Sequence, residues 1–357
     1  MIDREPTICY VFDTSNEVGR VRYRRRLEFA LAVLLCAAAL PVAAQDCDGW
    51  NTPGFFAQDK PPVHECLLAG ADVLARDESG WTPLHFAAAL DDASIVGLLL
   101  EYGADVWARD DNDWTPVHFA AARDGDASVI DVLVDHGADV SARDDKGWTP
   151  LHWAAWQGSN PDTITALTRA GAAVEARSRD GWTPLHLAAH GNGPDIICTL
   201  TGAGADVGAQ DLNLWTPLHW AAYGNADASV ITLLAQYADV NARDGSDWTP
   251  LHWAALNNKE PGIIHALQQA GAHLETRDYL RGWTPLHLAA VWKNPEAFGA
   301  LLAAEAGENT RDMERKTAWD YIADEDLQAY RAMASRSPAS VEPNDSQPFK
   351  TCSDVLQ

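Results

Sequence analysis

Histidine is the first residue of this sequence that suggests chemistry, because imidazole serves as a metal ligand and as an acid or base near neutral pH. Of the 12 histidines in the chain, seven recur at one position of a repeated phrase: His85, His118, His152, His186, His219, His252 and His287. Residues that recur once per packed helix lie about 8–10 Å apart, whereas zinc ligands each approach the ion to about 2 Å. The repeated histidines therefore predict no shared metal ion, and the other histidines are scattered without ligand spacing.

Acidic turns are the next candidates, because carboxylate oxygens bind calcium. The richest turn is Asp110-Asp111-Asn112-Asp113, which lacks the central glycine and the terminal glutamate of an EF-hand loop. Solvated turn residues are therefore the favoured interpretation. The sequence also lacks a nucleophile elbow, a Walker phosphate loop, a zinc ribbon and a Cys-x-x-Cys pair. We therefore predict a protein that is not an enzyme, with no catalytic residues, no metal and no cofactor.

Tryptophan is unusually frequent, with 15 in the chain. Seven of them stand directly before a repeated threonine: Trp81, Trp114, Trp148, Trp182, Trp215, Trp248 and Trp283. Trp156 and Tyr223 come three residues after an apolar position of the following helix and are expected near the same surface. Indole rings are enriched at the centres of protein interfaces, which favours a binding role. An aromatic ladder that holds neighbouring turns together is the alternative, and the sequence leaves it open.

These histidines and tryptophans belong to one phrase, Trp-Thr-Pro-Leu-His, with valine for leucine in one copy. Its threonines are Thr82, Thr115, Thr149, Thr183, Thr216, Thr249 and Thr284, in steps of 33 to 35 residues. Such a fixed period predicts a solenoid of stacked repeats. Threonine is a favoured N-cap and proline fits the first helical position, so each phrase begins a short helix. In the copy at Thr149, a turn and a second helix over about residues 162–169 follow, before Gly171.

The phrase, with Ile95-Val96-Gly97-Leu98-Leu99-Leu100 and Gly103-Ala104-Asp105-Val106, resembles the ankyrin repeat over about residues 47–330. The resemblance implies an all-α solenoid of stacked helix-turn-helix units, with hairpin fingers on one side and a role in protein interaction. It also implies that the repeated histidines bond to the backbone of the neighbouring finger. The tryptophans before the threonines would lie where each finger meets the first helix, on the concave face. We expect seven full repeats between degenerate caps, whose outer faces meet water.

Some copies depart from this pattern. Asp113, Leu214 and Asp247 replace the finger glycine of other copies, and these fingers are expected to differ in shape. Tyr237 replaces the glycine at the exit of a second helix. That turn must either rearrange or hold a tyrosine in the left-handed conformation, at a cost of about 1 kcal/mol.

The first 44 residues predict export. Five arginines in residues 20–26 precede an apolar run, residues 27–40, which is too short to span a bilayer comfortably. Val42-Ala43-Ala44 offers the small residues that a signal peptidase needs. The general secretory route is favoured over the twin-arginine route, and a retained anchor is the alternative. Residues 1–19 are interpreted as an over-long start, with the true start near Val18 or Val21.

The predicted domains follow from these features. Residues 1–44 form the signal peptide with its N-terminal extension, 45–78 the N-terminal capping unit, 79–334 the repeat domain with its C-terminal cap, and 335–357 a disordered tail. The tail is rich in serine, proline, asparagine and aspartate, a composition that buries little apolar surface. Cleavage after Ala44 would leave a periplasmic or secreted protein without stable membrane insertion.

The charge and the cysteines limit which class of partner and which compartment the sequence predicts. The chain has 26 Lys and Arg against 51 Asp and Glu, a net charge of −25, and the mature part would carry −26. With no basic block in the repeats, nucleic acids and acidic partners are disfavoured. In an oxidising compartment we predict a disulfide between Cys47 and Cys66 that clamps the first unit. Cys198 is expected near the surface, and a bond with Cys352 is left open, without support from the sequence.

The sequence therefore predicts an exported, monomeric module that binds a basic or neutral protein partner of unknown identity. The predicted partner surface consists of Trp81, Trp114, Trp148, Trp156, Trp182, Trp215, Tyr223, Trp248 and Trp283. The alternative function is a periplasmic binder of small molecules or glycans that stacks sugar rings on the same tryptophans. An open groove would favour the first function, and a closed pocket flanked by tryptophans the second.

Overall fold

A computed structural model describes residues 47, 49–58, 62–123, 125, 127–157, 160–335 and 352. These residues form seventeen α-helices and one 3-10 helix, without a strand among them, so the predicted all-α repeat fold is confirmed. The chain divides into two compact units, Met1–Asp105 (unit 1) and Val106–Gln357 (unit 2). The predicted signal peptide and nearly all of the predicted tail lie outside the described residues.

Unit 1 contains two helix pairs. Its helices are α2 (Pro53–Phe56), α3 (Val63–Leu68), α4 (Pro83–Ala89) and α5 (Ala93–Glu101). The short α2 begins where the side chain of Thr52 accepts a hydrogen bond from Phe55 N at 3.3 Å. Phe56 then stacks on Phe86 of α4 with ring centroids 5.7 Å apart. The N-terminal capping unit is thus a shortened helix pair, which packs on the first full repeat within unit 1.

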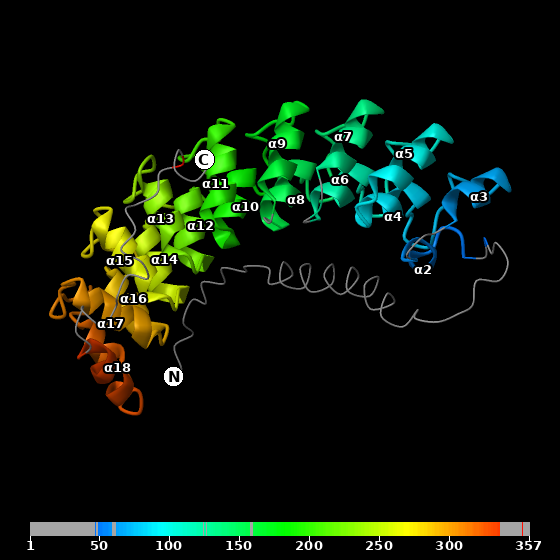
Figure 1. Cartoon of the computed structure of the whole chain (residues 1–357). Helices are drawn as coiled ribbons and strands as arrows, with labels where there is room; N and C mark the ends of the chain where they lie inside the picture. The colour runs from blue at the N-terminus through cyan, green and yellow to red at the C-terminus, as the bar shows by residue number, and fades with distance from the viewer. Residues whose placement is uncertain are drawn as a thin grey trace. The chain divides into compact units, whose positions relative to one another are not determined.

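Unit 2 is a stack of six helix pairs followed by a closing segment (Figure 1). The first helices are α6 (Pro116–Ala121), α8 (Pro150–Gln157), α10 (Pro184–Gly191), α12 (Pro217–Gly224), α14 (Pro250–Asn257) and α16 (Pro285–Val291). The second helices are α7 (Ser128–Asp135), α9 (Pro161–Arg169), α11 (Pro194–Gly202), α13 (Ala228–Ala235), α15 (Pro261–Gln269) and α17 (Pro295–Ala303). Successive first helices pack on one another, as do successive second helices, which gives two layers. The closing segment consists of η1 (Ala318–Tyr321) and α18 (Leu327–Ala334).

The first helices begin with a capping arrangement built from the repeated threonine and histidine. Before α10, Thr183 is extended, and its N–H donates to Nδ1 of His186 at 3.1 Å. The threonine hydroxyl lies 2.8 Å from the same nitrogen. Histidine thus takes the place that glutamate holds in the common capping box. The buried Ala188 and Ala189 that follow let the neighbouring helices approach closely.

Neighbouring fingers are joined by backbone hydrogen bonds. The bonds run from Arg179 N to Lys146 O at 3.1 Å, from Leu212 N to Asp180 O at 3.2 Å, and from Gly245 N to Asn213 O at 2.9 Å. The residues that replace the finger glycine keep its left-handed backbone, with φ of 62° at Asp113, 62° at Leu214 and 66° at Asp247. The expectation that these fingers differ in shape was therefore wrong, because finger pairing holds the backbone in place.

The exit turn at Tyr237 rearranges, which is one of the two predicted outcomes. Tyr237 is not among the residues with positive φ. Its N–H donates to Leu234 O at 3.0 Å, and Ala238 N donates to the same carbonyl at 2.9 Å. The turn thereby avoids the strain of a left-handed tyrosine.

A ladder of asparagines joins the turns between first and second helices. The side-chain amide of Asn225 donates to Ala189 O at 2.9 Å and Asn192 O at 3.0 Å. That of Asn258 donates to Ala222 O at 3.1 Å and Asn225 O at 2.8 Å. Since Asn225 and Asn258 are buried, these amides satisfy carbonyls that water does not reach.

Candidate functional site

The repeated histidines hold neighbouring repeats together. All seven are buried. Nε2 lies 3.0 Å from Trp182 O in His152, 3.0 Å from Trp215 O in His186 and 3.2 Å from Trp248 O in His219. Because Nδ1 accepts from threonine, Nε2 carries the proton and donates. At these three histidines, this confirms the bond to the neighbouring finger that the family resemblance implied.

Burial also sets the charge of these histidines. It lowers the pKa from 6.5 to about 4 at His152, His186, His219 and His252. These imidazoles are therefore neutral at pH 7. In the described parts of the chain, no group of three or more His, Cys, Asp or Glu side chains could hold a metal ion.

The nine residues of the predicted partner surface fall into two groups. Four are buried, with exposed fractions of 5% for Trp114, 3% for Trp148, 4% for Trp215 and 9% for Trp248. The other five are half-buried: Trp81, Trp156, Trp182, Tyr223 and Trp283. None of the nine is fully exposed, so only the half-buried rings offer surface to a partner.

The buried tryptophans pack between successive first helices. The ring of Trp148 lies 4.6 Å from that of Trp153 on the following helix, and Trp114 lies 4.4 Å from the same ring. Trp215 likewise lies 4.3 Å from Trp253 of the next repeat. Each buried ring is thus covered by aromatic neighbours from its own repeat or the next. At these four positions the contacts favour the alternative interpretation, an aromatic ladder.

Indole N–H groups also bind buried finger carboxylates. Nε1 of Trp153 donates to Oδ2 of Asp144 at 2.9 Å, and Trp253 donates to Asp244 at 2.8 Å. Oδ1 of Asp144 accepts from Trp148 N at 2.7 Å. Burial raises the pKa of Asp144 and Asp244, and these hydrogen bonds oppose the rise. Our sequence reasoning missed these pairs, although the nine-residue spacing from aspartate to tryptophan is a signal that could have found them.

The half-buried rings form a row along three first helices. Trp156 on α8 stacks on His190 of α10 with ring centroids 5.6 Å apart, and His190 lies 6.3 Å from Tyr223 of α12. A Cβ at Gly224 would lie 2.5 Å from Nε2 of His190, so the glycine makes room for the imidazole. We call Trp156, His190 and Tyr223 the aromatic row. We missed His190, although it shares its repeat position with the other two residues.

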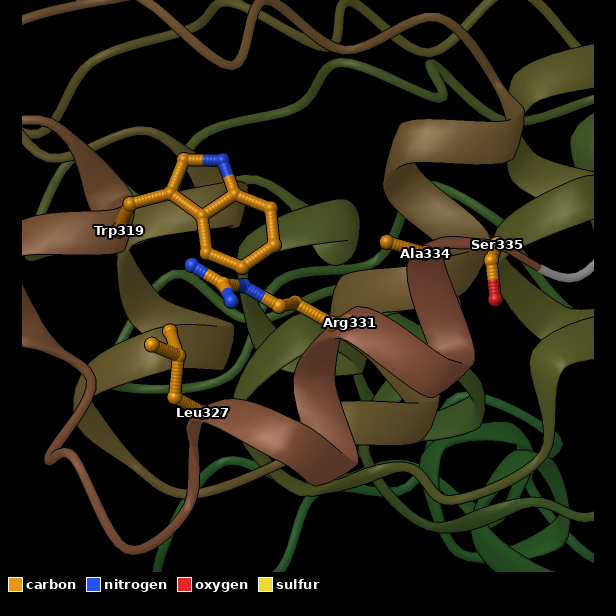
Figure 2. A pocket seen from close by; sticks show the side chains of 5 residues that line it. All are labelled: Trp319, Leu327, Arg331, Ala334 and Ser335. Carbon is orange, nitrogen blue, oxygen red and sulfur yellow. The ribbon is translucent and has the colours of Figure 1, made fainter.

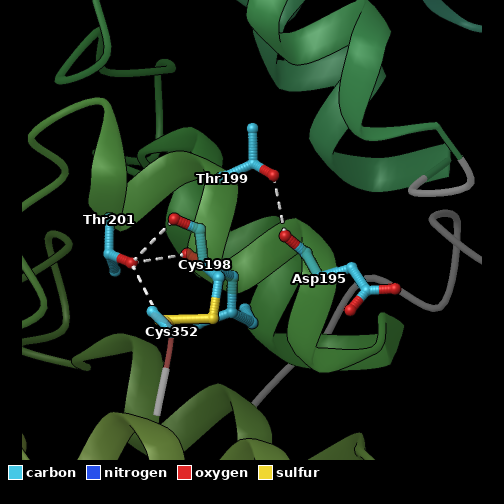
Figure 3. The surroundings of a disulfide bond; sticks show 6 residues. Asp195, Cys198, Thr199, Thr201 and Cys352 are labelled. Carbon is cyan, nitrogen blue, oxygen red and sulfur yellow. Dashed lines mark hydrogen bonds between the residues drawn. A yellow bond between two sulfur atoms is a disulfide. The ribbon is translucent and has the colours of Figure 1, made fainter. Parts of the chain in front are cut away.

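The two cysteine pairs lie in different units. In unit 1, Cys47 and Cys66 are joined with S–S 2.08 Å and Cα–Cα 5.6 Å. In unit 2, Cys198 of α11 is joined to Cys352, and the Thr201 hydroxyl lies 3.6 Å from Cys352 Sγ (Figure 3). Cys198 is fully buried, so the expectation that it lies near the surface was wrong. It sits on the side of α11 that the core and Cys352 cover.

A hollow of about 460 Å³ lies at the closing segment (Figure 2). It is lined by Trp319, Leu327, Arg331, Ala334 and Ser335. None of the nine residues of the predicted partner surface lines it.

The stacked helix pairs, joined by histidines and fingers, define a helical-repeat solenoid. The model for ankyrin repeats (3 copies) matches in seven overlapping stretches, 30–110, 55–144, 91–178, 121–211, 151–244, 185–278 and 245–313. The chain therefore belongs to the ankyrin repeat family, whose members are generally protein interaction modules and non-enzymatic scaffolds. A search of curated proteins found no match. Within the described residues, no helix has the length and apolar character that crossing a membrane requires.

Proposed function

We propose that the protein is an exported binding module without enzymatic activity, which holds a protein partner on the first-helix side of unit 2. The observation that carries this proposal is the aromatic row of Trp156, His190 and Tyr223, together with the half-buried Trp182. The three rings of the aromatic row stand on helices that are fixed by packing. A partner would therefore gain large contact area at little cost in conformational entropy.

The charge distribution favours a basic or neutral partner. The mature chain would carry −26, so its acidic side chains far outnumber its cations, and several of its arginines are held by finger carbonyls. Nη1 of Arg143 donates to Gly147 O at 2.8 Å and to Arg177 O at 2.6 Å. Arg177 binds Gly181 O and Gln210 O in the same way. The resulting negative field would speed the approach of basic partners and repel acidic ones, nucleic acids included.

Export is supported by two independent features. The first 44 residues have the order of a signal peptide, and two cysteine pairs lie at bonding distance in the fold. Disulfides persist in oxidising compartments such as the periplasm or the extracellular space. Intact-mass measurement of exported protein should give a chain that begins at Gln45. A mature species that still carries residues 27–40 would contradict cleavage there.

The partner surface is tested by replacing Trp182 with alanine. We expect the variant to lose at least about 2 kcal/mol of binding, roughly 30-fold in Kd, with little change in melting temperature. The partner would be captured from the envelope fraction by the wild-type chain, identified, and titrated against both chains. Trp215→Ala is the matched control. Because Trp215 is buried, the loss of its ring should destabilise the fold rather than weaken partner binding directly.

The outcome separates the binding surface from the aromatic ladder. If Trp182→Ala melts early while its folded fraction binds the partner normally, the ring is structural and the partner binds elsewhere. The alternative function, a binder of small molecules or glycans, called for a closed pocket flanked by the predicted tryptophans. The hollow in Figure 2 contains none of them.

A further inference from the structure

Two fingers of unit 2 place a cation of the chain over the ring of their own tryptophan. Nζ of Lys146 lies 5.6 Å from the ring centroid of Trp148 and 5.7 Å from that of Trp153. The guanidinium of Arg281 lies 4.8 Å from the ring centroid of Trp283. Each cation stands two residues before the tryptophan of its finger. This finger position is therefore suited to hold a positive charge against the ring.

The finger between residues 178 and 181 has the opposite charge at this position. Asp180 stands two residues before Trp182, where the neighbouring finger has Lys146. The side chain of Asp180 is exposed and, within the described part of the chain, takes part in no ion pair. No described cation lies over the half-buried ring of Trp182. A half-buried indole and an exposed carboxylate thus stand two residues apart in one finger, without the cation that the equivalent finger supplies.

We propose that Trp182 and Asp180 bind an arginine or lysine side chain of the partner, which deepens the proposed function and rests on it. The ring quadrupole of tryptophan attracts a cation over its face, and the Asp180 carboxylate accepts hydrogen bonds from the same group. Arginine fits better than lysine, because its planar guanidinium stacks on an indole and still donates in its own plane. The partner's cation takes the place that Lys146 takes at Trp148.

The other fingers of unit 2 do not offer this combination. Trp215 and Trp248 are 4% and 9% exposed, and the residues two positions before them, Asn213 and Ser246, are uncharged. Trp182 is also connected to the aromatic row through ring contacts. Its ring lies 6.2 Å from that of Trp148, which lies 6.0 Å from Trp156. A basic segment with its cation on Trp182 would therefore reach the aromatic row with neighbouring side chains.

A peptide probe tests the site without knowledge of the partner. The probe is a fluorescein-labelled nonapeptide of alternating glycine and arginine, and the reference is the same peptide with neutral citrulline for arginine. Fluorescence anisotropy with the mature chain should give at least tenfold tighter binding of the arginine peptide. Trp182→Ala should reduce its affinity to that of the citrulline peptide.

Asp180→Lys is the sharper variant, because it places a lysine where Lys146 stands in the neighbouring finger. The new lysine should cover Trp182 from within the chain and lower the affinity for the arginine peptide at least tenfold. Asp111→Lys makes the same change of charge at an exposed finger position without this ring, and it should stay within threefold of wild type. Equal losses in Asp180→Lys and Asp111→Lys would mean that only the overall charge attracts the peptide, and would overturn the site.

Failure of this site and failure of the proposed function give different results. If Asp180→Lys keeps the affinity for the identified partner while Trp182→Ala loses it, the surface binds the partner but the cation site is wrong. If both variants bind the partner as the wild type does, the surface itself is wrong. A loss in both variants, with Asp111→Lys unchanged, supports both inferences.

Discussion

At the scale of single residues, Leu214 is held in a backbone conformation that suits glycine. Its φ is 62°, and its side chain is 45% exposed, so little burial offsets the strain. We predict that Leu214→Gly stabilises unit 2 by about 0.5–1 kcal/mol, the relief of strain less the added freedom of the unfolded chain. Thermal or urea unfolding followed by circular dichroism would measure the gain.

Gly181, at the same finger position, should respond in the opposite direction. A Cβ there would lie 3.0 Å from Leu212 N, and the φ of Gly181 is 81°. Gly181→Ala is therefore expected to destabilise the unit. A loss of stability in Leu214→Gly would show that the leucine makes contacts worth more than the strain.

The buried histidines predict loss of stability in acid. Their pKa in the fold is about 4 against an ordinary value of 6.5, at His152, His186, His219 and His252. Between these pH values the unfolded chain binds protons that the folded chain does not. Each histidine then removes about 1.4 kcal/mol of stability per pH unit as the pH falls. Above pH 6.5 these histidines are neutral in both the folded and the unfolded chain, so this loss of stability is absent.

Buried aspartates act in the opposite direction, which makes the sign of the net change informative. Burial raises the pKa of Asp144, Asp211 and Asp244, so their contribution to stability grows as the pH falls. Since the histidine shifts are large and more numerous, we expect the melting temperature to fall steadily from pH 6.5 to pH 4.5. A melting temperature that stays level or rises across this range would contradict the expectation that the histidines dominate the acid response.

At the scale of elements, the asparagine ladder stabilises the stack from the side opposite the fingers. Asn258 is 6% exposed, its amide donates to two carbonyls of the preceding repeat, and its Oδ1 accepts from Glu260 N at 2.9 Å. We predict that Asn258→Ala costs about 3 kcal/mol, because it leaves these backbone groups buried without partners. Chemical unfolding of unit 2 would measure the cost.

Asn257 is the matched control for this prediction. It is exposed, and its amide makes one bond, to Tyr223 O at 3.1 Å. Asn257→Ala is expected to cost less than about 1 kcal/mol. Equal costs for the two variants would mean that the ladder contributes no more than a surface hydrogen bond.

The helix pairs could be predicted from the sequence, because caps, prolines and apolar positions are local signals that recur with the repeat. The position of the tryptophans at the junction of finger and first helix was implied by the family resemblance, but the burial of four of them was not predicted. Whether Trp148 faces solvent depends on Trp153 of the helix that follows it and on the neighbouring repeat. The asparagine ladder was missed for the same reason, since its bonds join residues of different repeats. The aspartate–tryptophan pairs lie within one repeat, nine residues apart, and were missed although this spacing recurs.

At the scale of the whole molecule, stability passes from each repeat to its neighbours, so a cross-link between distant positions of the chain has long-range effects. The pair Cys198 and Cys352 is separated by 154 residues, and the pair Cys47 and Cys66 by 19. In the chain-entropy account, closing these loops stabilises the fold by about 5 and about 3 kcal/mol respectively. The larger contribution belongs to unit 2 and the smaller to unit 1.

Because each disulfide lies within one unit, single serine variants should loosen different parts of the chain. We predict that Cys352→Ser speeds amide hydrogen exchange from α11 to α18 and leaves α2 to α5 unchanged, whereas Cys47→Ser does the reverse. Peptide mapping of the exported protein without reductant should first find both pairs bonded. If both thiols of a pair are free, that bond is absent. If Cys352→Ser exchanges as the wild type does although the bond forms, the last repeats are held by packing alone, because an effective cross-link must slow the opening of the repeats that it encloses.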